Sequence, residues 1–168
     1  MGVVVLTGAS GAGKTTISEA FADLYPMLAE VHFFDRIPVP SLDEMTARFG
    51  SPDEWQRMKT TEWLQRLAER MRSQPNILFD GQTRCQFVRE GQKKAKIDNL
   101  QIVLVDCDDS TRIHRLTHDR QQPELADERM MNWARFLREE ALREGETILD
   151  TSRLSIDESV ERLRRYFD

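Results

Sequence analysis

The sequence is poor in cysteine and has no long hydrophobic run. Its 2 cysteines, Cys85 and Cys107, are too few for the disulfide framework of a small secreted domain, and neither has the CxxC spacing of a zinc site. Residues 1–6, MGVVVL, are too short for a signal-peptide core or a membrane span. We therefore expect a reduced, cytoplasmic protein with no membrane partner.

An excess of basic charge is also lacking. The chain has 24 Lys and Arg residues against 29 Asp and Glu residues, a formal net charge of −5 at pH 7. Proteins that bind nucleic acid usually carry a basic face, so this balance does not favour a nucleic-acid partner. With 39% hydrophobic residues, the 168 residues are enough to bury one core, and we expect a single domain over residues 1–168.

Five short apolar runs have the character of buried strands. They do not alternate with polar residues, which is typical of strands that helices cover on both faces of a parallel sheet. The runs are residues 3–6, 31–34, 77–79, 102–105 and 147–149. Helical segments lie between them, so the order of elements predicts an α/β fold with right-handed crossovers.

Three capping boxes mark the expected starts of helices. Ser41, Ser51 and Ser155 each precede a glutamate by three residues, and Pro52 occupies the first helical position after the second of them. A further helix is expected over residues 126–144. Apolar side chains recur at helical spacing in three of these helices, and we expect them to be core: Trp55, Met58, Leu64, Leu67, Ala68 and Met71; Met130, Trp133, Ala134, Leu137 and Ala141; and Ile156, Val160, Leu163 and Phe167.

The segment GASGAGKT, residues 8–15, matches the Walker A pattern in full. An apolar strand precedes it, and an amphipathic helix is expected over residues 15–24. Glycines allow the tight turn in which backbone N–H groups point at phosphate oxygens, and the helix N-terminus adds the positive end of its dipole. The predicted nucleotide-binding residues are Gly8, Ser10, Gly11, Ala12, Gly13, Lys14, Thr15 and Thr16.

This loop predicts the use of ATP and Mg²⁺. Lys14 should reach the β- and γ-phosphates, and the Thr15 hydroxyl should bind the metal ion. An aspartate at the end of a neighbouring strand should position the ion through water, and both Asp80 and Asp106 follow four strand-like residues. Asp80 is favoured because of the segment that follows it. The other interpretation of Asp106 is a cap for a helix that begins near Asp109.

The segment DGQTR, residues 80–84, resembles the DGxPR segment of nucleoside monophosphate kinases. RIHRLTHDR (112–120) and ILDTS (148–152) follow it in the order found in related kinases. With the phosphate loop, these segments make the whole chain similar to the P-loop kinase superfamily of adenylate, shikimate, gluconate and chloramphenicol kinases.

The resemblance implies a three-layer P-loop NTPase fold with a five-stranded parallel sheet in the order 2-3-1-4-5. It also implies a helical acceptor-binding insert at about residues 36–75 and a mobile lid at about residues 119–135. Lids in this superfamily carry arginines that close on the phosphates. Arg120 is the first candidate for this catalytic role, with Arg115 and Arg129 as alternatives.

The acceptor side of the predicted site depends on three residues. Asp35 follows the second strand, at the edge where α/β sheets place their ligands. In superfamily members that phosphorylate hydroxyls, an aspartate at this point binds the acceptor and acts as base, so the resemblance implies both roles for Asp35. The alternative for Asp35 is a turn or cap role. Arg36 either pairs with Asp35 or meets an anionic acceptor. The DGQTR match places Arg84 near the acceptor.

The function that fits best is an ATP-dependent phosphotransferase that acts on a small-molecule hydroxyl or on a nucleotide. Two other classes stay open, a nucleotide-dependent regulatory ATPase and a polynucleotide end kinase. The sequence has no NKxD-type motif of GTPases and no LSGGQ-like signature of ABC ATPases. The acidic net charge argues against a polynucleotide end kinase.

Overall fold

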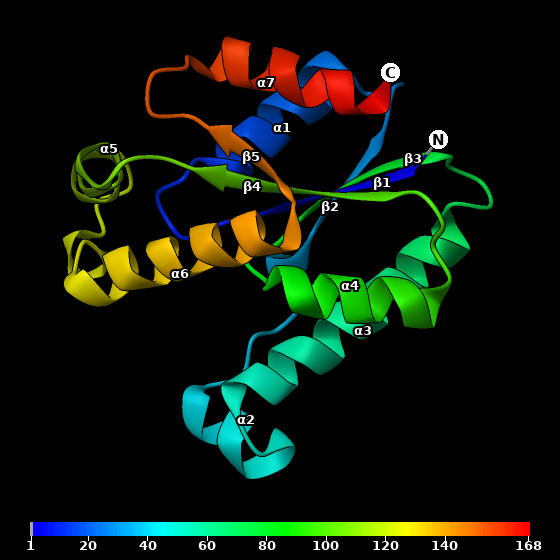
Figure 1. Ribbon diagram of the computed structural model, residues 1–168, viewed down its shortest axis with the longest axis horizontal. Coiled ribbons are helices and arrows are strands. Elements are labelled where there is room, and N and C mark those ends of the chain that lie inside the picture. Colours follow the sequence, from blue (N-terminus) through cyan, green and yellow to red (C-terminus); the bar gives the residue numbers. More distant parts are fainter. Residues whose placement is uncertain (1) are drawn as a thin grey trace.

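The computed structural model describes residues 2–168, which fold around one five-stranded sheet (Figure 1). All neighbouring strands pair in parallel, in the order β2-β3-β1-β4-β5, as predicted. The strands are β1 (Gly2–Thr7), β2 (Glu30–Phe33), β3 (Asn76–Asp80), β4 (Leu100–Asp106) and β5 (Thr147–Asp150). Each overlaps one of the five apolar runs.

Helices connect the strands. The α-helices are α1 (Lys14–Leu24), α2 (Leu42–Phe49), α3 (Pro52–Arg70), α4 (Cys85–Ala95), α5 (Asp109–His114), α6 (Glu128–Glu144) and α7 (Ile156–Arg164). Four short turns complete the chain: the 3-10 turns η1 (Phe34–Arg36), η3 (Pro123–Leu125) and η4 (Arg165–Phe167), and the π turn η2 (Arg115–Asp119).

The sheet is covered on both faces, which gives three layers. Figure 1 shows α1 and α7 on one side of the sheet and α3, α4 and α6 on the other. Side chains of β1 enter two separate cores in alternation: Val3 and Val5 join the core under α3, α4 and α6, whereas Val4 and Leu6 join the core under α1 and α7. Because both faces are buried, the strands carry unbroken apolar runs.

The predicted helix ends are confirmed. Ser41 and Ser155 form complete capping boxes, and the Ser51 hydroxyl accepts the backbone N–H of Glu54. Gly145, in the left-handed conformation at φ 72°, ends α6. Each cap satisfies backbone groups that a helix end would otherwise leave without a partner.

Two side chains of the predicted apolar stripes are not core. Met58 is 37% exposed and Ile156 is 49% exposed. Met58 belongs to the first half of α3, which extends beyond the sheet towards α2 (Figure 1). Ile156 stands in the first turn of α7, where it lines a surface cavity. Amphipathic spacing alone does not show where a helix leaves the body of the protein.

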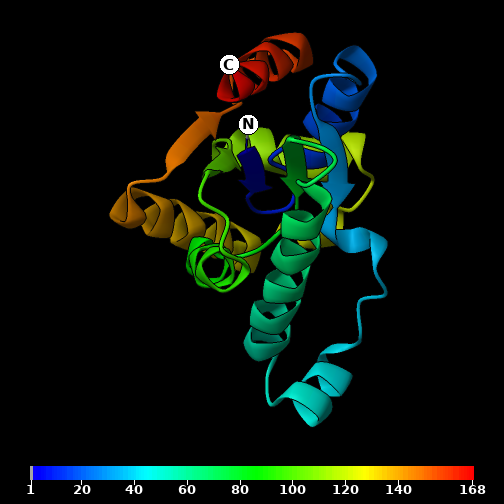
Figure 2. The same cartoon turned by 90° about the vertical axis from the view of Figure 1, so that its right-hand side faces the viewer.

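The segment predicted as an acceptor insert contains α2 and α3. In Figure 2, α2 lies at the end of α3 that is remote from the sheet. The segment predicted as a lid covers the end of η2, all of η3 and the first two turns of α6. Both functional assignments remain predictions. Within residues 2–168, every helix is too short or too polar to cross a membrane.

Candidate active site

The loop between β1 and α1 has the backbone that its glycines allow. Gly8 has φ 145°, and a Cβ there would lie 2.1 Å from the carbonyl oxygen of Val105. Gly13, at φ 97°, is the N-cap of α1. No side chain of residues 2–168 caps the N-terminus of this helix. The first N–H groups of α1 are therefore free to bind an anion.

Side chains from other elements hold three successive carbonyls of this loop. Arg112 donates to Ser10 O at 2.9 Å, and the Cys107 thiol contacts Gly11 O at 3.7 Å. Ala12 O accepts from Arg115 at 3.1 Å and from the Thr151 hydroxyl at 3.0 Å. In a trans peptide the carbonyl and the following N–H point in opposite directions. Fixing these carbonyls therefore also fixes the directions of the N–H groups that follow them.

The Lys14 side chain bends back over the loop. Its Nζ donates to Gly8 O at 2.7 Å and to Ala9 O at 3.3 Å. Burial lowers the pKa of Lys14, against the opposing influence of the Asp80 and Asp35 carboxylates. A desolvated ammonium held in this way attracts a phosphate strongly.

Asp80, at the end of β3, is 4% exposed. Burial raises the pKa of Asp80, whereas the charge of Lys14 and the nearby hydroxyls of Ser18 and Thr15 lower it. Neither Asp80 Oδ2 nor Ser18 Oγ has a partner with hydrogen-bond geometry among residues 2–168. A buried carboxylate oxygen without a partner, beside two hydroxyls, is a donor set that suits Mg²⁺.

The rest of the coordination shell would have to come from outside the protein. Residues 2–168 contain no group of three or more His, Cys, Asp or Glu side chains that could hold a metal ion by themselves. Mg²⁺ in phosphoryl-transfer sites is typically bound by one or two protein ligands, with phosphate oxygens and water as the others. Thr15 and Asp80 fit that pattern, and their assignment to the metal remains a proposal.

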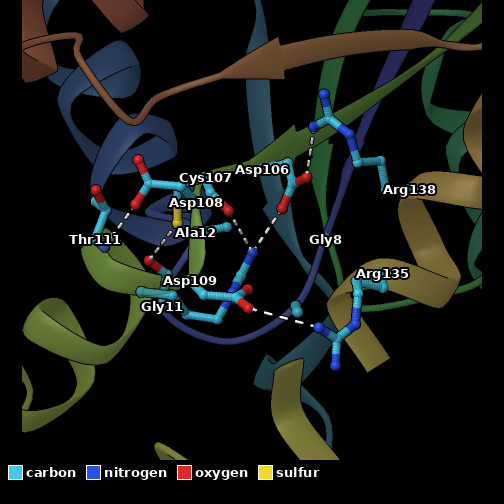
Figure 3. Close-up of polar contacts among 12 residues, drawn as sticks. Gly8, Gly11, Ala12, Asp106, Cys107, Asp108, Asp109, Thr111, Arg135 and Arg138 are labelled. Carbon is cyan, nitrogen blue, oxygen red and sulfur yellow. Dashed lines mark hydrogen bonds and ion pairs between the residues drawn. The ribbon is translucent and has the colours of Figure 1, made fainter. Parts of the chain in front are cut away.

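Asp106 is occupied by two arginines. Its Oδ1 accepts from Arg112 at 2.5 Å and its Oδ2 from Arg138 at 2.8 Å (Figure 3). The interpretation of Asp106 as a helix cap is wrong, because Asp108 accepts the N–H of Thr111 and caps α5. That hydrogen bond lowers the pKa of Asp108 to about 2. Asp106 still belongs to β4, and both of its oxygens are engaged.

Two cavities meet at the phosphate loop. The larger, about 440 Å³, runs along residues 11–17, and Arg115, Thr151 and the start of α7 line its other side. The smaller, about 250 Å³, lies between the loop and η1. The side chains that line both cavities are Lys14, Thr15 and Arg120. The smaller cavity is also lined by Ser10, Glu19, Phe33, Asp35, Arg36, Asp80 and Gln82.

The three arginines predicted for the lid differ in their positions relative to the two cavities. Arg120 lines both cavities, directly after the π turn in which its N–H bonds to the carbonyl of Arg115 at 2.9 Å. Arg115 lines only the larger of these two cavities and is bound to Thr151. Arg129 lines neither of them, pairs with Asp127 at 2.9 Å, and has 93% of its side chain exposed.

Arg84 lies outside both cavities. Its Nε and Nη2 donate to Glu140 at 3.0 and 2.9 Å, and its guanidinium stacks on Phe87 and Phe136. Glu140 is 1% exposed, and a carboxylate buried to that degree needs a charged partner. Arg84 therefore links α4 to α6, and this arrangement gives no support to the predicted contact with the acceptor.

Asp35 and Arg36 are both exposed on η1, directly after β2. The Arg36 guanidinium lies 4.3 Å from the centre of the Phe33 ring. The negative charge of Asp35 raises the pKa of Lys14, so the two side chains are close enough to interact electrostatically. The structure thus brings Asp35, Arg36 and Asp80 into one cavity with Lys14.

Sequence analysis missed several residues of the site. Glu19 follows Thr15 by four positions on α1, a spacing that puts both on one helix face. Gln82 stands inside the DGQTR segment and lines the smaller cavity. Arg112 precedes the three arginines considered for the lid, and its ion pair with Asp106 gives no local signal in the sequence.

The model of the AAA domain family matches residues 4–130, more than half of the chain. The chain belongs to this family. The predicted resemblance to P-loop kinases is confirmed at the level of the fold. No curated protein matches the chain in sequence.

Solved structures of three kinases have the same fold as this chain. A shikimate kinase from Acinetobacter baumannii in complex with shikimate has 20% identity and a TM-score of 0.59, over 97% of this chain and 90% of that one. A gluconokinase from Sinorhizobium meliloti 1021 has 19% identity and a TM-score of 0.63, over 99% and 91%. A sugar kinase from Janibacter sp. HTCC2649 has 20% identity and a TM-score of 0.65, over 100% and 95%.

Proposed function

We propose that this protein is an ATP-dependent phosphotransferase that transfers the γ-phosphate of ATP to a hydroxyl group of a small molecule. The observation that carries the proposal is the meeting of two cavities at Lys14, Thr15 and Arg120, with Asp35 and Asp80 in the smaller one. The three kinases of similar fold, named for shikimate, gluconate and sugar, support the same reaction type.

In this proposal the larger cavity holds the nucleotide. The N–H groups at the start of α1 and the Lys14 ammonium bind the β- and γ-phosphates. Arg120, which reaches both cavities, stabilises the charge on the group in transfer. Thr15 and Asp80 would hold Mg²⁺, which neutralises phosphate charge when bound.

Asp35 receives the acceptor. Its carboxylate accepts the hydrogen bond of the acceptor hydroxyl, orients the oxygen towards the γ-phosphate and takes up the proton that the hydroxyl releases. Its position fits this role, because η1 places it in the smaller cavity with Lys14 and Asp80. Positioning and charge stabilisation supply most of the acceleration in phosphoryl transfer.

The smaller cavity favours a hydroxyl compound over a nucleotide acceptor. A nucleoside monophosphate would bring a doubly charged phosphate near the carboxylates of Glu19 and Asp35. Arg84, the arginine predicted to meet it, is bound to Glu140. Arg36 is left as an acceptor-side cation, and one exposed arginine neutralises only part of the charge of a phosphate dianion.

The experiment is a measurement of MgATP consumption with a panel of sugars, sugar acids, cyclitols and nucleoside monophosphates. We expect turnover that depends on a hydroxyl compound and yields its phosphate ester, detected by mass spectrometry. Turnover with nucleoside monophosphates alone would contradict the acceptor class. Hydrolysis that is independent of every acceptor and stimulated by a protein partner would support a regulatory ATPase, and salt-sensitive transfer to oligonucleotide ends would support an end kinase.

A further inference from the structure

A buried carboxylate behind the phosphate loop joins two elements that both bear on the candidate site. Asp106 is 6% exposed, and its two oxygens accept from arginines of different helices. Arg112 comes from α5 and Arg138 from α6. Figure 3 shows the Arg138 guanidinium approaching the Asp106 carboxylate from α6.

Arg112 is itself fully buried at 0% exposure. Its Nη1 donates to Ser10 O at 2.9 Å, while its Nη2 donates to Asp106 at 2.5 Å and to Cys107 O at 3.2 Å. A Cβ on Gly11 would lie 3.0 Å from Arg112 Cγ, so the loop rests directly on this side chain. One planar guanidinium thus fixes the peptide between residues 10 and 11 and anchors it to β4.

Asp106 makes this arrangement energetically acceptable. A buried guanidinium without a counter-ion would carry a large desolvation cost. The carboxylate supplies the counter-charge and at the same time sets the rotation of the guanidinium, because the two nitrogens that bond are part of one plane. The orientation of the Gly11 N–H in the phosphate loop therefore depends on a carboxylate that lines neither cavity.

Arg138 connects the same carboxylate to α6. Its Nη1 lies 2.8 Å from Asp106 Oδ2, with 43% of its side chain exposed. The first two turns of α6 belong to the segment predicted as a lid. A second link between α6 and α5 is longer and exposed on both sides, since Arg135 lies 3.7 Å from Asp109 (Figure 3).

We propose that Asp106 and Arg112 are positioning residues for phosphate binding. Arg138 couples the position of α6 to that of the phosphate loop through its hydrogen bond to Asp106. The assignment rests on the proposed phosphotransferase function, because a loop that binds no phosphate would have nothing to position. It also gives different roles to the two aspartates considered for the metal in the sequence analysis: Asp80 binds Mg²⁺, and Asp106 orients the phosphate loop.

Three substitutions test this assignment against one matched control. Asp106→Asn removes the counter-charge of Arg112, and Arg138→Ala removes only the link to α6 from a half-exposed position. Arg138→Lys keeps a positive charge that can reach Asp106. The control is Arg143→Ala on the same helix, where the side chain is 64% exposed and lies 3.9 Å from Glu144.

We expect Asp106→Asn to raise KM for ATP about tenfold and Arg138→Ala about threefold, with a smaller loss in kcat. Arg138→Lys should recover most of the Arg138→Ala loss, and Arg143→Ala should match the wild type. The Mg²⁺ concentration for half-maximal rate should stay unchanged in Asp106→Asn. A shift of that concentration would place Asp106 at the metal and overturn the assignment, as would an Arg138→Ala variant that behaves like Arg143→Ala.

Two readouts do not require turnover, so failure of the proposed function can be told from failure of this inference. Hydrogen exchange of a peptide covering residues 8–16 should be faster in Arg138→Ala than in Arg143→Ala, while a peptide from α4 exchanges equally in both. The thermal stabilisation by MgATP should be smaller in Arg138→Ala. Equal exchange in the loop of the two variants would overturn the proposal even if the Asp106→Asn variant does not fold.

Discussion

On the nucleotide side of the candidate site, four side chains from distant parts of the chain hold the carbonyls of Ser10, Gly11 and Ala12. On the acceptor side, Asp35 and Arg36 stand exposed on one short 3-10 turn. The first region is held by contacts from outside the loop, whereas the two side chains of the second are exposed to solvent.

This difference matches the demands of the two substrates. The triphosphate is the same in every turnover, so a rigid set of N–H groups lowers the entropic cost of binding it. An acceptor must be distinguished from similar compounds, and specificity can be built from a few contacts that close around the correct molecule. The predictions below test whether changes on the rigid side alter phosphate binding and transfer, and whether changes on the open side alter use of the acceptor without altering ATP binding.

The largest effect is expected on the rigid side, for Lys14→Ala. Phosphate transfer should fall about a thousandfold, because the ammonium stabilises the charge on the transferred group. Thermal unfolding without nucleotide should stay close to the wild type. Stopped assays of product phosphate measure the loss, and Lys94→Ala, at an exposed position in the last turn of α4, is the control. Full activity of Lys14→Ala would contradict the assignment of the loop.

On the open side, Asp35→Asn should lower kcat about a hundredfold, since the amide cannot take up the acceptor proton. The thermal shift produced by MgATP should be unchanged. Asp43→Asn, in the first turn of α2, provides a matched control on an exposed carboxylate. Equal losses of ATP binding and turnover in Asp35→Asn would instead indicate a structural role for Asp35.

Asp80→Asn should separate metal binding from folding. We expect the Mg²⁺ concentration for half-maximal rate to rise about tenfold, because the amide is a weaker ligand than the carboxylate. Burial raises the pKa of Asp80 in the folded protein, so its ionised form costs folding free energy at neutral pH. The unfolding temperature without ligand should therefore rise in the variant at pH 7.

The sign of this effect can be checked by pH. A carboxyl whose folded pKa lies above its unfolded value stabilises the fold as pH falls through the raised pKa. The wild type should thus approach the stability of Asp80→Asn as pH is lowered from 7 through the raised pKa towards the unfolded value of about 4. A variant that unfolds at a lower temperature than the wild type at both pH values would refute the argument.

The smallest effect is expected for Arg36→Ala, which should raise KM for the acceptor about two- to fivefold and leave kcat and ATP binding unaltered. The exposed guanidinium stacks on Phe33 and contributes a single screened charge. The control is Arg143→Ala, which removes a 64% exposed arginine of α6 from outside both the smaller cavity and the predicted acceptor insert. Identical acceptor KM values in the two variants would remove Arg36 from the acceptor site.

The fold and the phosphate loop could be predicted because their determinants are local. Strands covered on both faces show as unbroken apolar runs, and Ser41 and Ser155 cap their helices with a glutamate three residues away. The Walker A pattern likewise encodes a backbone shape in eight consecutive residues. Local signals of this kind do not depend on where distant parts of the chain lie.

The contacts behind the site could not be predicted, because they join residues that only the fold brings together. Arg84 and Glu140 are 56 positions apart, and nothing near Arg84 shows that a buried carboxylate will occupy it. The pair of Asp106 with Arg138 spans 32 positions. Charged residues on amphipathic helices look alike in sequence whether they face water, a cavity or a buried partner.

Helix α2 is capped at both ends, by the capping box of Ser41 at its N-terminus and by Gly50 at its C-terminus. Met45 is the residue of α2 that is buried in the core. A segment built in this way can be exchanged as a cassette. Ile37 and Phe49 also pack against the core, so replacing residues 38–48 while keeping that methionine would leave these core contacts in place. Libraries made there would test whether this segment contributes to the choice of acceptor.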